Sequence, residues 1–267
     1  MMRALRAEFL KLKRSRMLLW TALVVVVYAA FAAALMLVFK NDAQMLNTIA
    51  SAGGAFSKAA AAGMFDLNWV NQLRTAVQGI SGSWGVLTFS FVTAYVFGRE
   101  YKEGTEKNML TVPLRREYII AAKMMVVACW VLALTLFSLA LQSAGLAVLG
   151  IEGFAWKHVA VALLDSLEVT LLLYLTLPVV AWVAMVGHGY LRAMLFAFAM
   201  MMVSNGLATT DASRYFPWNM PIHVVGASWM PIPPSNLVAT SWVIAIGVFA
   251  VGCGLAIRQI DTADTTT

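Results

Sequence analysis

One pair of acidic residues has a spacing suited to ion chemistry. Asp165 and Glu168 stand three residues apart, so on a helix their carboxylates would project from one face. Paired acids within membrane helices hold cations or relay protons in transporters. If a span begins at Glu168, however, both carboxylates lie at the membrane interface and need no partner in the hydrocarbon. The sequence leaves both alternatives open.

Other reactive side chains indicate no catalytic centre. His158, His188 and His223 fall in different predicted loops, so their spacing does not indicate a metal site. Cys129 and Cys253 both lie within apolar stretches, which favours packing over a disulfide. We therefore expect no catalytic residues and no bound metal.

A charged segment, residues 98–123, separates two apolar stretches. It holds six Lys/Arg and four Asp/Glu in a chain that is only 12% charged. Arg99 and Glu103 stand four apart, as do Glu103 and Lys107, which favours a helix. Gly104 can end the helix that leaves the membrane, and Pro113 stops a short helix that follows. Such a protrusion would contact a soluble partner; the alternative is a solvated loop that only sets topology.

The elements that position these residues are membrane helices. With 61% hydrophobic residues, the chain is predicted to be an all-α polytopic membrane protein. At about 20 residues per span, six spans leave no room for a second soluble domain. We expect a single transmembrane domain over 1–267. The predicted spans are 17–39, 79–98, 124–149, 168–187, 193–208 and 237–257.

The basic residues predict the orientation. If the N-terminus is cytoplasmic, fourteen of the nineteen Lys/Arg lie on that side. This bias predicts a multi-pass protein of a bacterial-type plasma membrane with both termini in the cytoplasm. The net charge of +6 is then a topology signal and does not indicate nucleic-acid binding. The first apolar stretch is too long for a signal peptide, so we expect an uncleaved anchor.

Residues 1–16 predict an amphipathic elbow helix at the membrane interface. Four apolar side chains fall within one arc and three basic ones lie opposite: Met2, Leu5, Phe9 and Leu12, against Arg3, Lys11 and Arg14. Leu10 does not fit this pattern. The helix is either a basic flank that sets topology or an elbow that also touches a cytoplasmic partner.

Within the charged segment, the string RE-x-x-EGT precedes a short apolar stretch, a proline, basic residues and a lysine that opens the next span. These residues are Arg99, Glu100, Glu103, Gly104, Thr105, Leu110, Pro113, Arg115, Arg116 and Lys123. The pattern resembles the second cytoplasmic segment of ABC-2-type permeases. A second cluster resembles permeases similar to those for bacitracin or lantibiotic immunity; it comprises Tyr215, Phe216, Pro217, Trp218 and Pro221.

The resemblance implies a permease subunit of an ATP-binding-cassette exporter. No GxxxxGK[ST] sequence is present, so ATP and Mg would bind to two separate ATPase subunits, which would hydrolyse the ATP. The segment 99–123 would contain the cytoplasmic coupling helix. The implied ATPase contacts are Glu100, Glu103, Gly104, Thr105, Glu106, Lys107 and Leu110, followed by Arg3, Arg6 and Lys13 of the elbow. No internal repeat is evident, so we expect a dimer with a second copy or a sister permease.

Two further regions are candidates for a translocation path. Gly82 and Gly85 form a small-residue edge, which either packs closely against a helix or lines the path. Met201 and Asn205 either contribute to an adaptable wall or pack in the core or against lipid. Residues 209–236 are rich in proline and tryptophan, which predicts a re-entrant gate or an interfacial anchor.

The function predicted is export of a hydrophobic or amphipathic compound, such as a peptide antibiotic or drug. One alternative is an ATP-independent secondary transporter that uses Asp165 and Glu168. Another is a structural membrane subunit that transports nothing.

Overall fold

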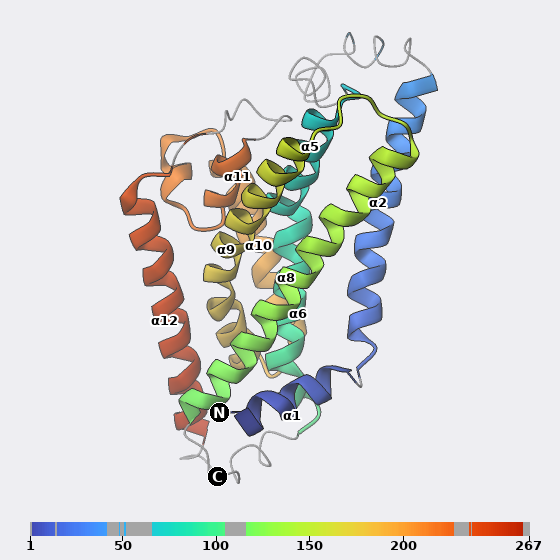
Figure 1. Ribbon diagram of the computed structural model, residues 1–267. Coiled ribbons are helices and arrows are strands. Elements are labelled where there is room, and N and C mark those ends of the chain that lie inside the picture. The colour runs from blue at the N-terminus through green and yellow to red at the C-terminus, as the bar shows by residue number, and fades with distance from the viewer. Residues whose placement is uncertain are drawn as a thin grey trace.

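The computed structural model shows a bundle of helices (Figure 1). It describes residues 2–13, 15–41, 48, 51, 66–104, 116–226, 235 and 237–263. No strand occurs among these residues. The elements, in chain order, are α1 (Met2–Lys13), α2 (Met17–Asn41), α5 (Trp69–Ser81), α6 (Ser83–Lys102), α8 (Arg116–Val148), α9 (Trp156–Val186), α10 (Tyr190–Leu207), the 3-10 helix η1 (Asp211–Tyr215), α11 (Met220–Val225) and α12 (Ala239–Ala263).

The described helices confirm a polytopic membrane protein. Five of them are long and apolar enough to cross a bilayer: α2, α8, α9, α10 and α12. A sixth span forms if α5 and α6, which meet at an angle of 44°, cross together. With 33 and 31 residues, α8 and α9 are longer than the roughly 20 residues that a bilayer requires, so they tilt or extend beyond the hydrocarbon.

The second span differs from its predicted bounds of 79–98. The helix α6 begins at Ser83, after a break at Gly82, and α5 precedes it. Asn68 caps α5, because its side-chain oxygen accepts a hydrogen bond from the Asn71 backbone N–H at 2.9 Å. The helix α5 is therefore joined to the span through the break at Gly82.

The third and fourth spans begin earlier than predicted. The helix α8 begins at Arg116, whose side chain donates to the Ile260 carbonyl of α12 at 2.9 Å. This leaves 103–115, and not 99–123, as the connection between α6 and α8. The helix α9 begins at Trp156 and not at 168, because one face of its first turns, with Val159, Ala162 and Leu163, packs against the core.

The two ends of the bundle carry different elements (Figure 1). At one end, called the α1 end, α1 lies against the last turn of α6 and the first turns of α8, and α12 ends at the same end of the bundle. An ion pair of 3.0 Å between Arg116 and Asp261 joins α8 to α12 there. At the other end, called the α11 end, α5, η1 and α11 gather around α9. The first described helix, α1, and the end of the last one, α12, therefore lie at the same end of the bundle.

The centre of the bundle is α9, which contacts α5, α6, α8, α10, α11 and α12. Within its most apolar stretch 61% of residues are buried, against 22% for α2, which packs mainly on α8. The helix α12 reaches α9 through a close approach at Gly252. A Cβ atom there would lie 2.8 Å from the Cβ of Pro178.

We predict that Gly252→Ala destabilises the bundle, because the added methyl group meets Pro178 and the Val179 backbone on α9. Overpacking of this kind costs about 1–3 kcal/mol. Gly247→Ala on the same helix is the matched control, since a Cβ there meets nothing within 4 Å. Thermal unfolding of the purified protein should show a lower Tm for Gly252→Ala only. Equal Tm values for the two variants would contradict the close contact.

Candidate functional site

Four charged side chains meet at the α1 end and join three helices. Glu8 and Lys11 come from α1, Glu100 from α6 and Lys123 from α8. The Lys11 ammonium lies 2.7 Å from both Glu8 and Glu100. The Lys123 ammonium lies 3.0 Å from Glu100 and 3.5 Å from Glu8. We call these four residues the charge cluster.

Burial within the charge cluster is graded. The side chains of Lys123 and Glu100 are only 3% and 6% exposed, whereas Lys11 is 41% exposed. Taking an ion out of water costs several kcal/mol, so the inner pair requires close partners of opposite sign. Lys123 also donates to the Val96 carbonyl at 3.1 Å and lies 5.6 Å from the centre of the Phe97 ring.

The two cations and two anions of the cluster balance. Burial by itself would lower the pKa of Lys11, but its hydrogen bonds to Glu100 and Glu8 outweigh this effect, and its pKa is raised. Lys11 therefore stays charged near neutral pH. The cluster fixes α1 across the end of the bundle, where Leu12 is buried and Leu5 packs against the core.

Next to the cluster, α6 ends at an exposed corner. Glu103 and Gly104 are both exposed. Gly104 has a φ of 64°, the left-handed conformation that commonly ends a helix, so the predicted stop is confirmed. Two residues before Gly104, Lys102 donates to the hydroxyl of Tyr190 and lies over its ring, which links α6 to α10. The corner is thus held by neighbours on both sides.

The residues predicted to contact an ATPase fall into three groups. Glu103, Gly104 and Arg6 are exposed at the α1 end, as such a contact requires. Glu100 is buried in the charge cluster, so its carboxylate faces the interior of the bundle. The rest cannot be placed: Thr105, Glu106, Lys107 and Leu110 lie outside the described residues, as do the side chains of Arg3 and Lys13.

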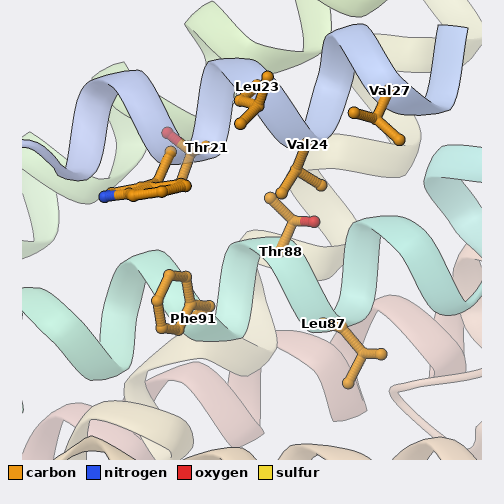
Figure 2. A pocket seen from close by; sticks show the side chains of 8 residues that line it. Thr21, Leu23, Val24, Val27, Leu87, Thr88 and Phe91 are labelled. Atoms are coloured by element: carbon orange, nitrogen blue, oxygen red, sulfur yellow. The ribbon is translucent and has the colours of Figure 1, made fainter. Parts of the chain in front are cut away.

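An apolar groove of about 570 Å³ lies between α2 and α6. Val24 of α2 and Thr88 of α6 face each other across it, and Phe91 lies further along α6 (Figure 2). The groove opens at the side of the bundle, where α2 is loosely packed. It would accept an apolar chain or ring system from the membrane.

The predicted path residues lie elsewhere. Gly85 and Met201 are buried, whereas Asn205 is exposed on α10 and Gly82 occupies the break before α6. A Cβ at Gly85 would lie 1.9 Å from the Ile80 carbonyl oxygen, so the bend itself needs this glycine. None of the four lines the groove between α2 and α6.

Comparison with known proteins assigns the chain to a family. The profile of the ABC-2 family transporter proteins matches residues 4–204. The bacitracin transport permease protein of Bacillus licheniformis is 32% identical over 160 residues, which cover 56% of this chain and 72% of that protein. The chain belongs to the ABC-2 transporter family. The resemblance stated from the sequence is therefore confirmed.

In this ABC-2 permease the paired acids lie inside a helix. Asp165 and Glu168 are both half-buried on α9, nine and twelve residues after its start at Trp156. Because α9 begins before the predicted span start at Glu168, both interpretations stay predictions for these two acids. Counted back from Val186, they stand roughly 27–32 Å along the helix, about one hydrocarbon thickness. This places them toward the α11 end.

The permease folds part of 209–236 into a buried polar network. Asn219 donates to the Ser204 carbonyl at 3.0 Å and to the Ser213 hydroxyl at 3.1 Å. His223 bridges Ser213 at 2.9 Å and Ser235 at 3.1 Å. Burial, and then the nearby Arg214 charge, lower the pKa of His223, which favours the neutral ring.

Trp218 in the same segment is also buried, with its ring 5.5 Å from that of Phe216 and 6.0 Å from that of Phe196. It is packed inside the protein and is not an interfacial anchor. Residues 227–234 and 236 lie outside the described residues, so a re-entrant gate over the whole of 209–236 stays a prediction.

We expect Lys123→Met to be the most destabilising lysine change in the charge cluster. It leaves Glu8 and Glu100 with Lys11 alone, and an uncompensated buried charge costs about 3–5 kcal/mol. Lys11→Met should cost less, because Lys11 is half-exposed and Lys123 still neutralises Glu100. The double variant Glu100→Gln/Lys123→Met should lose less than the sum of its single changes. Thermal unfolding of these three variants and of the single variant Glu100→Gln measures this order. Equal losses for the two lysines would refute the graded cluster.

Proposed function

We propose that the chain is the membrane subunit of an ATP-binding-cassette exporter for a hydrophobic or amphipathic compound. Membership of the ABC-2 transporter family carries the proposal. The relative from Bacillus licheniformis is named as a bacitracin transport permease, which supports an amphipathic peptide antibiotic as the substrate class. The apolar groove between α2 and α6 is compatible with such a compound.

Energy would enter at the α1 end. ATP and Mg would bind to two partner ATPase subunits, which dock at the corner formed by Glu103 and Gly104 beside Arg6 of α1. Motion of that corner would pass directly into α6, which continues into the bundle. The charge cluster would pass it to α1 and α8 as well, because Glu100 lies only three residues before Glu103. The permease would act as a dimer with a second copy or a sister permease.

The α1 end would face the cytoplasm. This orientation puts fourteen of the nineteen basic residues on the cytoplasmic side, in agreement with the positive-inside rule. It also brings the soluble ATPase to the exposed corner of α6. The α11 end, with its polar network, would face outward.

The first functional prediction is that Glu103→Lys uncouples the permease from its ATPase. The exposed side chain is dispensable for folding, but like charges across an interface cost several kcal/mol. The variant should insert at normal abundance, lose the co-purified ATPase or its coupled hydrolysis, and stop export. Co-purification in detergent and vesicle transport measure this outcome.

Glu152→Lys is the matched control, since Glu152 is also exposed but lies in the α8–α9 connection at the α11 end. It should leave ATPase binding and export unchanged. Full activity of Glu103→Lys would remove the corner of α6 from the interface.

The competing function, secondary transport through Asp165 and Glu168, makes the opposite prediction about acids. In an ATP-driven exporter, Glu168→Gln should retain export within about twofold, because no proton passes through the carboxylate. Export should also survive a protonophore and be blocked by vanadate. Loss of export by Glu168→Gln at normal abundance, together with protonophore sensitivity, would favour secondary transport.

A further inference from the structure

A second, smaller pocket lies at the α11 end between α5, α9 and α11, and its volume is about 260 Å³. Three of its lining residues are polar: Arg74 from α5, and His158 and Asp165 from α9. The remaining walls are aliphatic side chains. The pocket is separate from both the charge cluster and the groove between α2 and α6.

The polar groups of this pocket retain unused binding capacity. Arg74 donates through Nε to the Val225 carbonyl at 3.1 Å, and its guanidinium has further donors. Among the described residues, no ion pair joins Arg74 to Asp165 and no hydrogen bond reaches the Asp165 carboxylate. The Nδ1 atom of His158 is buried without a partner. A cation, an anion and an imidazole thus face one small space.

The size of the pocket and its surroundings point to a lipid head group. Pockets for drug-sized ligands measure about 300–1,000 Å³, so this one is too small for a peptide antibiotic. Val161 and Leu164 are exposed along α9 and would accompany acyl chains. Phe154 and Trp156 are exposed at the start of α9, with ring centres 5.2 Å apart, as is typical of the membrane interface.

We propose that this pocket binds a phospholipid head group that carries both a phosphate and a primary amine. The Arg74 guanidinium would bind the phosphate through charge-assisted hydrogen bonds, and the Asp165 carboxylate would accept from the ammonium group. A trimethylammonium head group has no N–H to donate. A head group without an amine would leave Asp165 opposite a phosphate. The site is independent of the transported compound and of the ATPase.

The test uses the permease purified alone in detergent, with native mass spectrometry to measure bound lipid. The probes are phosphatidylethanolamine, phosphatidylcholine and phosphatidylglycerol with identical acyl chains. The wild-type protein should bind phosphatidylethanolamine about tenfold more tightly than either of the others, as one charge-assisted hydrogen bond allows. Asp165→Asn should abolish the preference over phosphatidylcholine. Arg74→Gln should weaken the binding of phosphatidylethanolamine and of phosphatidylcholine by similar factors.

Glu168→Gln is the matched control, because it removes a carboxylate one turn further along α9 that does not line the pocket. It should keep the tenfold preference. Arg74→Lys retains the positive charge and should keep phosphatidylethanolamine as the preferred lipid, which separates lost binding from lost folding. Equal binding of phosphatidylethanolamine and phosphatidylcholine by the wild type would overturn the proposal. So would an unchanged preference in Asp165→Asn, or strongest binding of phosphatidylglycerol.

Discussion

The structure depends on the buried ion pair between Glu100 and Lys123. Each of these side chains is buried in an apolar bundle and needs a partner of opposite charge, because an uncompensated buried charge costs about 3–5 kcal/mol. Their contact fixes the register of α6 against α8. Glu8 and Lys11 complete the balance of charge from α1, so an amphipathic helix that would otherwise lie freely at the membrane surface is attached to two spans.

This attachment couples the positions of α1, α6 and α8 at the α1 end of the bundle. The corner at Glu103 and Gly104 is exposed, yet it stands within one turn of the buried pair. A force applied at the corner cannot move α6 without moving α1 and α8, unless the cluster breaks. By contrast, α2 packs mainly on α8, and an open groove separates part of it from α6. The loosely packed helix α2 is therefore adjacent to α6 and α8, the helices through which the proposed motion would pass.

Much of the fold could be predicted because hydropathy over about 20 residues identifies a span directly. The family could also be recognised, from the string around Glu103 and Gly104. Helix bounds could not be predicted as well, since α5 carries buried Gln72 and Gln78, whose amides donate to the Asp66 carbonyl just before α5 and to the Val225 carbonyl of α11. The partners of Glu100 were also missed. Its place in a contact motif indicated an exposed side chain, and only the antiparallel return of α8 brings Lys123 to the same depth. The available signal was that Glu100 and Lys123 carry opposite charges at matching depths of consecutive spans, which indicates an ion pair between them.

The two ends of the molecule differ in how far their buried polar side chains are paired. In the charge cluster at the α1 end, two cations face two anions at 2.7–3.5 Å, so these four side chains hold α1, α6 and α8 together. At the α11 end, Asn219 and His223 satisfy a network of serines, but Arg74, Asp165 and His158 face a small pocket with capacity remaining. Unsatisfied charges at a membrane interface carry a cost that an occupant with complementary charges removes. The α11 end is therefore where the surrounding lipid can influence the bundle, at the opposite pole from the proposed entry of energy.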